Sequence, residues 1–111
     1  MFRALQALAE VGRDYFQAQQ GGPPLGPLDR AIRRRVPYKY SPTESQSTLS
    51  QYGSERVFHH LDRSGQMVRH LTLGGGNRNN CLQLYFEFDD TNRRLLIGYC
   101  GRHLPFVRQR T

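Results

Sequence analysis

Four residues in the second half of the sequence carry side chains that suit the cleavage of RNA without a metal ion. They are His70, Tyr85, Arg102 and His103. In such a reaction one group removes the proton of the 2′-hydroxyl, another protonates the departing 5′-oxygen, and an arginine stabilises the negative charge that builds up on the phosphate. Histidine suits proton transfer because its pKa lies near neutral pH. These four residues are therefore the candidate catalytic residues.

The stretch from Cys81 to Leu104 must position most of these groups, because it carries the clearest strand pattern of the chain. Apolar residues alternate with polar ones on both sides of the segment 89–92, Asp-Asp-Thr-Asn, which predicts a β-hairpin with strands 81–88 and 93–100. A turn centred between Asp90 and Thr91 aligns the apolar residues of the two strands on one buried face. The expected buried pairs are Phe86 with Leu95, Leu84 with Ile97, and Leu82 with Tyr99.

The second face of this hairpin is expected to be polar and open, and to form the working surface. It would pair Tyr85 with Leu96, Gln83 with Gly98, Glu87 with Arg94 as an ion pair, and Cys81 with Cys100. The two cysteines are close enough in this register for a disulfide, although reduced thiols are expected in the cytosol.

An earlier strand, 67–73, supplies the first candidate histidine. Its alternation places Met67, Leu71 and Leu73 on one face and His70 on the other. We therefore expect His70 and Tyr85 to be neighbours on the polar face of the sheet.

The rest of the chain predicts a single α+β domain, 1–111, in which one or two N-terminal helices pack on a four-stranded antiparallel sheet. Residues 2–19 have helical periodicity and end at Gly21-Gly22-Pro23-Pro24, and 27–35 form a short second helix. The Ser/Thr/Gln-rich segment 41–54 is expected to be a long, mobile loop. Strands 56–61 and 67–73, joined by a turn at 62–65, then complete the sheet. In the first helix the expected apolar face consists of Phe2, Leu5, Leu8, Ala9, Gly12, Tyr15 and Phe16.

The charge of the chain favours an anionic partner. There are 16 Lys+Arg and nine Asp+Glu residues, so the formal net charge is +7. Arginines in sequence with Tyr38, Lys39 and Tyr40 are typical of segments that hold phosphates and stack on bases. The competing interpretation is a solvated helix end followed by a linker. The expected nucleic-acid-binding residues are Arg33, Arg34, Arg35, Lys39 and, in the loop before the hairpin, Arg78.

Several classes of protein find no support in the sequence. There is no phosphate-binding P-loop, nucleophile elbow, HExxH motif or Cys/His spacing of a zinc site, and His59 and His60 point to opposite faces of a strand. We therefore expect no metal and no cofactor. No apolar stretch predicts export or membrane insertion, so the expected compartment is the cytoplasm.

The hairpin resembles a known family. The segment Leu84-Tyr85-Phe86-Glu87-Phe88-Asp89-Asp90, followed by Arg94 to His103 with its Gly-Arg-His end, is similar to the C-terminal hairpin of RelE-type toxins. The order of helices before an antiparallel sheet is similar to that family and to other small toxin ribonucleases. The resemblance implies a cytoplasmic endoribonuclease of a toxin–antitoxin system, with RNA, free or on the ribosome, as substrate and a protein antitoxin as partner. It assigns phosphate stabilisation and acid–base work to Arg102 and His103.

Two other functions use the same residues. A regulatory module of a phage or mobile element could bind nucleic acid or an acidic protein surface without cleaving anything, and a structural subunit could use the sheet face as an oligomer contact. Binding that weakens with salt separates the nucleic-acid binders from the structural subunit, and cleavage of RNA separates the enzyme from the binding module.

Overall fold

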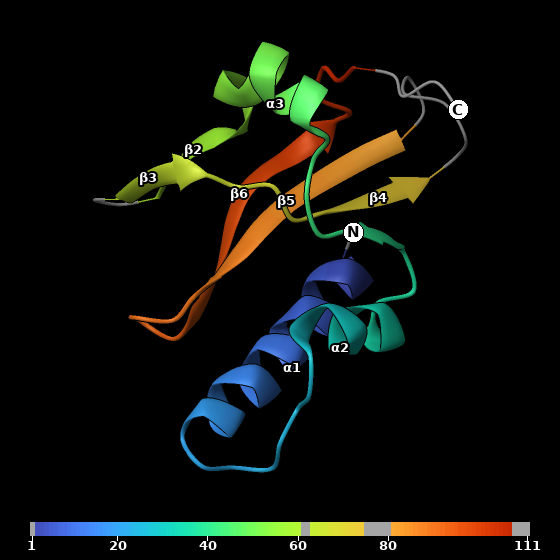
Figure 1. Ribbon diagram of the computed structural model, residues 1–111. Helices are drawn as coiled ribbons and strands as arrows, with labels where there is room; N and C mark the ends of the chain where they lie inside the picture. Colours follow the sequence, from blue (N-terminus) through green and yellow to red (C-terminus); the bar gives the residue numbers. More distant parts are fainter. Residues whose placement is uncertain (1, 61–62, 75–80, 108–111) are drawn as a thin grey trace.

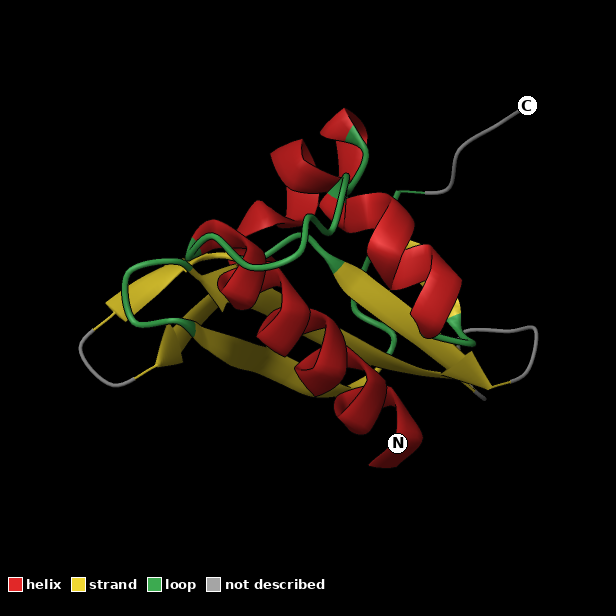
Figure 2. Ribbon diagram, turned by 90° about the horizontal axis from the view of Figure 1, so that it is seen from below, coloured by secondary structure: helices red, strands yellow, loops and turns green. Residues whose placement is uncertain are grey.

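The computed structural model describes residues 2–60, 63–74 and 81–107, and these form three layers (Figure 1). Helices α1 (Phe2–Gln19) and α2 (Leu28–Arg35) form the first layer, and Figure 2 shows α1 running across the sheet. A four-stranded antiparallel sheet is the middle layer. Helix α3 (Gln46–Tyr52), the 3-10 helix η1 (Gly53–Arg56) and a two-stranded hairpin form the third layer. The predicted α+β fold, with helices packed on a four-stranded antiparallel sheet, is confirmed.

The composition of that sheet differs from the prediction. Its order is β1 (Lys39–Ser41), β4 (His70–Gly74), β5 (Cys81–Asp89) and β6 (Arg94–Arg102). The strand predicted at 56–61 is β2 (Val57–His60), which pairs only with β3 (Arg63–Gln66) in a separate hairpin. The short strand β1, which no alternation pattern marks, takes the fourth place in the main sheet. The tip of the β2–β3 hairpin, residues 61 and 62, lies outside the described residues.

The first helix has the predicted bounds but a rotated buried face. Ala4, Leu8 and Val11 are fully buried, whereas Phe2 is 78% exposed and Leu5 36% exposed. The helix ends as expected, because Gly21 adopts a left-handed φ of 89°. The second helix, α2, also lies where the sequence predicts it, and its Ile32 joins the core beneath the sheet.

The hairpin β5–β6 forms with a register that differs from the prediction. Phe86 pairs with Ile97 rather than Leu95, because Asp89 still belongs to β5 and residues 90–93 make the turn. The Asp89 carboxylate accepts hydrogen bonds from the backbone N–H groups of Thr91 and Asn92, which stabilises the turn at this shifted position. Phe88, not Phe86, therefore faces Leu95.

A β-bulge changes the register a second time. Beyond Phe86–Ile97 the next pair is Tyr85 with Tyr99, so Gly98 is the extra residue on β6. Tyr99 therefore shares a face with Tyr85, and the predicted pair of Leu82 with Tyr99 was wrong, because Leu82 lies opposite Arg102. The predicted Cys81–Cys100 pair was also wrong: these residues lie opposite Gly74 and Leu84, and no disulfide joins them.

The second face of the sheet is covered, contrary to the prediction that it is open. Phe58 of β2 packs against the rings of Tyr85 and Tyr99, with ring centroids 5.8 and 6.1 Å apart. Tyr85 is fully buried, and only 1% of Gln83 is exposed. The third layer thus supplies a second set of buried contacts above the sheet.

Part of the third layer comes from the segment 41–54, for which the sequence predicted a loop. That prediction was wrong for Gln46–Tyr52, which form α3. Ser45 caps this helix, because its side chain accepts a hydrogen bond from the backbone N–H of Thr48 at 3.2 Å. The sequence thus contains a signal for the start of this helix, Ser45, but the helix itself has too few apolar residues to show a helical pattern.

Gly98 permits the close contact between the sheet and the third layer, which gives a first prediction. A Cβ atom at this position would lie 2.6 Å from both Met67 Sδ and Phe58 Cδ2. Gly98→Ala should therefore lower the free energy of unfolding by about 1–3 kcal/mol through overpacking. Gly65→Ala is the matched control, because a Cβ there meets nothing within 4 Å. Urea denaturation measures both, and equal stabilities of the two variants would contradict the packing argument.

Candidate functional site

A hollow of about 360 Å³ lies on the face of the sheet opposite α1. Leu71 and Leu84 point into the core shared with α1, so the alternate residues of β4 and β5 point to the other face. The loop before α3 and the start of that helix form one wall of the hollow, and the segment after β6 forms the other. Lining groups from each part are Ser41, Glu44, Thr48, His70, Gln83 and His103.

Two rows of paired residues cross this face of the sheet. Ser41 of β1 pairs with His70 of β4, which pairs with Tyr85 of β5. The predicted neighbourhood of His70 and Tyr85 is thus present, and their rings stack with centroids 4.6 Å apart. The second row consists of Lys39, Thr72 and Gln83.

Glu44 lies at the centre of the polar contacts beside this floor. Its Oε2 accepts hydrogen bonds from the Tyr85 hydroxyl at 3.0 Å and from Arg56 Nε at 2.6 Å. Its other oxygen, Oε1, lies 3.5 Å from His70 Nε2. Only 9% of the Glu44 side chain is exposed. One carboxylate therefore joins a tyrosine, an arginine and a histidine.

Arg56 is the cation that balances this carboxylate. Its side chain is fully buried, and its Nη2 lies 2.6 Å from Glu44 Oε2. Its Nη1 donates to the carbonyl oxygen of Pro105 at 2.5 Å, and its guanidinium lies 5.7 Å from the centroid of the Tyr85 ring. A buried charge needs a partner and hydrogen bonds to be tolerated. Arg56 thus neutralises Glu44 and fastens the C-terminal segment to the third layer.

The tautomer of His70 follows from its backbone contact. Its Nδ1 lies 2.8 Å from the carbonyl oxygen of Val68, so Nδ1 carries a proton and donates a hydrogen bond to that oxygen. The second nitrogen, Nε2, then faces Glu44. Burial lowers the pKa of His70 below its ordinary value of 6.5, and nearby Arg56 and His103 lower it further, against the opposing effects of Val68 and Glu44. His70 is therefore neutral at neutral pH, with an unprotonated Nε2.

Tyr85 is a donor rather than a base in this cluster. Burial raises its pKa above the ordinary value of 10.0, and the neighbouring Glu44 carboxylate raises it further. Its hydroxyl stays protonated and points at Glu44. Its role in the structure is to orient the carboxylate that faces His70.

His103 lines the hollow from the C-terminal segment, where three side-chain bonds fix the backbone. Gln83 Oε1 accepts from the N–H of Leu104 at 2.6 Å, and Thr48 Oγ1 accepts from the N–H of Val107 at 3.0 Å. The third bond is the one from Arg56 to Pro105. The ring of His103 packs against that of Phe106, with centroids 4.8 Å apart. The two imidazoles thus reach one hollow from different elements.

The fourth candidate, Arg102, is not part of the hollow. It pairs with Leu82, which is on the sheet face of Leu84 and not on that of Gln83. The arginine that the fold brings to the cluster is Arg56, which the sequence analysis placed at the start of a strand. Glu44 was missed as well, because it lies in a polar segment without a pattern.

The basic residues predicted to bind nucleic acid are distributed over different surroundings. Arg33, Arg34 and Arg35 are exposed at the end of α2, but Arg35 pairs with Asp14, and Arg33 lies over the ring of Tyr40. Lys39 is exposed and lines the hollow. Arg78 lies outside the described residues. Of the five, Lys39 is the cation that the described structure places at the hollow.

A second charged cluster has a structural role. Arg69 contacts Asp29 Oδ1 at 2.5 Å and Glu87 Oε1 at 2.9 Å, and donates to the Tyr40 hydroxyl at 2.7 Å. It thereby ties α2 and β1 to β5. The predicted ion pair of Glu87 with Arg94 was wrong, because the shifted register places Glu87 opposite Leu96, and Arg94 pairs with Asp89.

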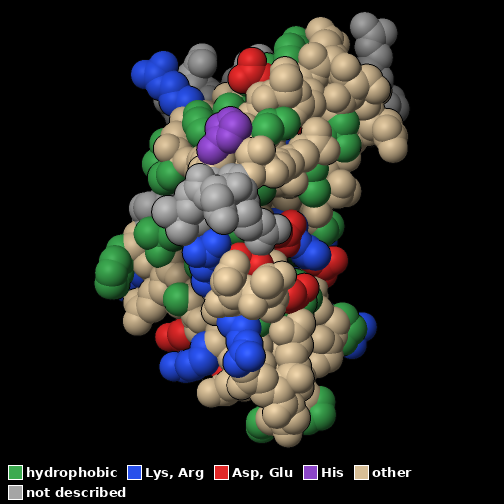
Figure 3. All heavy atoms as spheres, turned by 90° about the vertical axis from the view of Figure 1, so that its left-hand side faces the viewer, with side chains coloured by type: hydrophobic (Ala, Val, Ile, Leu, Met, Phe, Trp, Pro, Cys, Tyr) green, Lys and Arg blue, Asp and Glu red, His purple; other side chains and the backbone are tan. Residues whose placement is uncertain are grey.

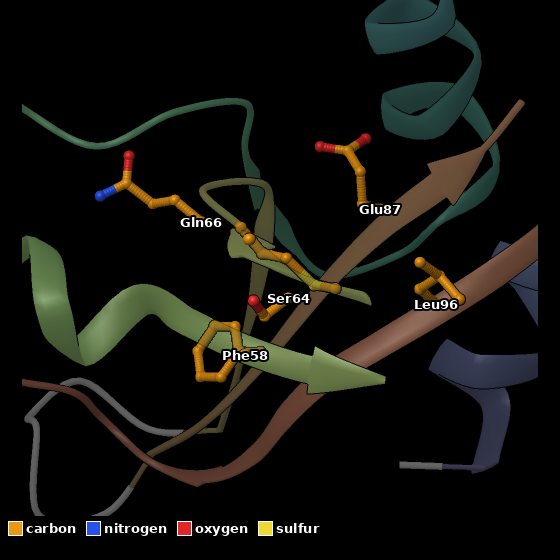
Figure 4. Close-up of a pocket in the computed structure, with 7 residues that line it drawn as sticks. Phe58, Ser64, Gln66, Glu87 and Leu96 are labelled. Carbon is orange, nitrogen blue, oxygen red and sulfur yellow. The ribbon is translucent and has the colours of Figure 1, made fainter. Parts of the chain in front are cut away.

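Glu87 also borders a smaller pocket of about 90 Å³, between the β2–β3 hairpin and the sheet. Figure 4 shows Phe58, Gln66 and Leu96 around it, with Glu87 at one side. Among the described lining residues, Glu87 is the only one that titrates. A single carboxylate cannot act as both acid and base in one step, so the hollow lined by His70 and His103 is the candidate active site.

Charges of both signs are mixed on the face drawn in Figure 3, where basic and acidic side chains lie side by side. The described structure contains ion pairs of arginine with aspartate, Arg69–Asp29 and Arg35–Asp14 among them. The net positive charge of the chain is therefore not gathered into a uniform basic surface there.

Three comparisons complete the description of the site. No known protein family, no curated protein and no solved structure matches this chain. The resemblance to RelE-type toxins therefore stays a prediction. Within the described ranges, no helix has the length and hydrophobicity to cross a membrane, and no three His, Cys, Asp or Glu side chains group as metal ligands would.

Proposed function

We propose that the hollow is the active site of an endoribonuclease that cleaves RNA by attack of the 2′-hydroxyl on the neighbouring phosphate. The observation that carries the proposal is that His70 and His103 line the same hollow from separate elements. A pair of imidazoles supplies both the base and the acid that this reaction needs. Lys39, which also lines the hollow, supplies positive charge for the phosphate.

His70 acts as the general base in this proposal. Its Nε2 is unprotonated, because the other nitrogen donates to Val68. When Nε2 takes the proton of the 2′-hydroxyl, the imidazole becomes a cation beside the Glu44 carboxylate 3.5 Å away. Glu44 stabilises that cation, and Tyr85 and Arg56 hold Glu44 in position. Glu44 is thus a positioning residue of the site.

His103 acts as the general acid. Its Nδ1 lies 2.8 Å from the carbonyl oxygen of Leu104, so the backbone of the next residue holds the ring, and His103 lines the hollow. In this proposal the other ring nitrogen, Nε2, delivers the proton. The 2′-oxygen bonds to phosphorus, the bond from phosphorus to the 5′-oxygen breaks, and His103 protonates that oxygen. The products are a 2′,3′-cyclic phosphate and a 5′-hydroxyl. His70 gains one proton, and His103 gives one up.

The direct test is the cleavage of a labelled RNA oligonucleotide by the purified chain. Cleavage should persist in EDTA, and it should be abolished by a single 2′-deoxy substitution at the cleaved nucleotide, because the nucleophile is then missing. The same oligonucleotide with the deoxy substitution one position away is the matched control. RNA that stays intact both alone and on ribosomes would overturn the enzyme proposal and favour the non-catalytic binding module.

The pH dependence gives a separate prediction. Activity requires neutral His70, so it should fall as the pH drops through the folded pKa, which lies below 6.5. The unfolded chain also binds this proton at a higher pH than the folded chain, since its His70 has the ordinary pKa. Stability should therefore be full above about pH 6.5 and decline below it. Rate and urea midpoints measured from pH 5 to 8 test both effects, and an acidic limb above pH 6.5 would contradict them.

A further inference from the structure

Gln83 presents a hydrogen-bond donor to the hollow that the protein itself does not use. Its oxygen accepts from the backbone N–H of Leu104 at 2.6 Å. A backbone N–H can only donate, so this contact fixes which end of the amide faces Leu104. The amide nitrogen is left on the other side, and Gln83 lines the hollow. Among the described residues, none accepts a hydrogen bond from that nitrogen.

Burial makes this donor informative. Only 1% of Gln83 is exposed, and buried polar groups nearly always have a partner. The amide nitrogen is not fully enclosed, because Arg56 Nη2 is the one described side-chain atom that is both buried and without a hydrogen-bond partner. The opening that Gln83 lines is the hollow. A ligand atom in the hollow that accepts a hydrogen bond would give the amide nitrogen of Gln83 its partner.

The position of Gln83 suits a base rather than the reacting phosphate. His70 pairs with Tyr85, two residues from Gln83 along β5, so Gln83 and the His70 row are about 7 Å apart. That spacing is comparable to the distance from a phosphate to the base of the same nucleotide. An uncharged amide suits the edge of a base, which it can read by a hydrogen bond.

We propose that Gln83 donates to a keto oxygen of the nucleobase and makes the hollow prefer guanine and uracil over adenine and cytosine. This inference rests on the proposed ribonuclease function. Guanine and uracil carry a keto oxygen at the position where adenine and cytosine carry an amino group, which is itself a donor. An amino group facing the Gln83 nitrogen would leave two donors in contact and no acceptor. The substrate class is therefore RNA with a keto base at the cleavage site.

Binding of nucleoside 3′-monophosphates tests the inference without any reaction. Guanosine, inosine and adenosine 3′-monophosphate are titrated into the wild-type chain by calorimetry. Guanosine and inosine share the 6-keto oxygen, so both should bind about tenfold more tightly than adenosine. Inosine lacks the 2-amino group of guanosine, so equal binding of these two assigns the preference to the keto oxygen. Equal binding of all three, or binding of none, would overturn the inference.

Gln83→Glu adds a second arm. The carboxylate keeps an oxygen for Leu104 but replaces the donor with an acceptor, so at pH 8 the preference should reverse towards adenosine. Gln51→Glu, the same change on the exposed face of α3, should keep the wild-type preference. An unchanged preference in folded Gln83→Glu would overturn the assignment to Gln83. If that variant does not fold, the wild-type series still decides.

The two proposals can fail separately. If nucleotides bind with the keto preference but the chain never cleaves RNA, the result supports base selection by Gln83 and refutes the proposed ribonuclease function. Cleavage of RNA after all four bases at equal rates would support the ribonuclease and overturn the inference about Gln83.

Discussion

His103→Ala should slow the cleavage of RNA by about 10²–10⁴-fold while the chain stays folded. The loss follows from the poor leaving group, because a 5′-oxygen that departs without a proton leaves as an alkoxide. The side chain is only partly buried, and its ring contacts Phe106 at the edge of the hollow, so its removal should leave the core intact. Single-turnover rates with circular dichroism on the same samples measure both effects.

A change of leaving group separates the two histidines. A uridine 3′-(4-nitrophenyl phosphate) releases a nitrophenolate that needs no general acid, so His103→Ala should recover most of its lost rate on this substrate. His70→Gln should stay slow on both substrates, because the 2′-hydroxyl still has to lose its proton. His59→Ala is the matched control, since His59 is exposed on β2 and does not line the hollow. Recovery by His70→Gln instead would reverse the two roles, and wild-type rates in both variants would move the chemistry elsewhere.

The sequence predicts the parts of this fold that depend on local signals. The first helix ends where Gly21 and the following prolines end it, and β5 is a strand where its alternation predicts one. Which stripe of α1 is buried is a different question. Leu8 belongs to both stripes, whereas Ala4 and Val11 compete with Leu5 and Ala9 for the buried side, and packing between distant elements decides between them.

A local pattern could not predict the register of the hairpin either, because the register also depends on packing between distant elements. The bulge at Gly98 accompanies the approach of Phe58 and Met67, which belong to another layer. The predicted turn, 89–92, and the observed one, 90–93, have the same length, so the turn alone does not reveal the register. Three differences from the prediction arise from elements that the alternation within one strand does not reveal. They are the covered second face of the sheet, the absence of a Cys81–Cys100 pair, and the different partner of Glu87.

The contacts of the candidate site are likewise predictable from the sequence only in part. Alternation within two strands places His70 beside Tyr85, so the sequence predicts that contact. Glu44 reaches Tyr85 across 41 positions of sequence, and Arg56 reaches Pro105 across 49. Such contacts depend on the complete fold. A charged residue in a polar segment carries no sign that the fold will bury it.

Arg56→Met should lower the free energy of unfolding by about 3–5 kcal/mol, a large share of the about 5–15 kcal/mol typical of a domain. The change leaves the Glu44 carboxylate buried without its cation, and it removes the donor to the Pro105 carbonyl. The cost is that of a buried carboxylate without a compensating charge. Urea denaturation at pH 7 measures it.

Arg69→Met is the matched control for Arg56. Arg69 joins two carboxylates where Arg56 joins one, but its side chain is 25% exposed and those of Asp29 and Glu87 are 43% and 38% exposed. Water can therefore solvate the charges that remain, so the loss should be clearly smaller than at Arg56. Adding Glu44→Gln to Arg56→Met should restore part of the stability, because a neutral amide costs less to bury than an unpaired carboxylate. Equal losses for the two arginines, or no recovery in the double variant, would show that the Glu44–Arg56 pair does not hold the wall of the hollow to its floor.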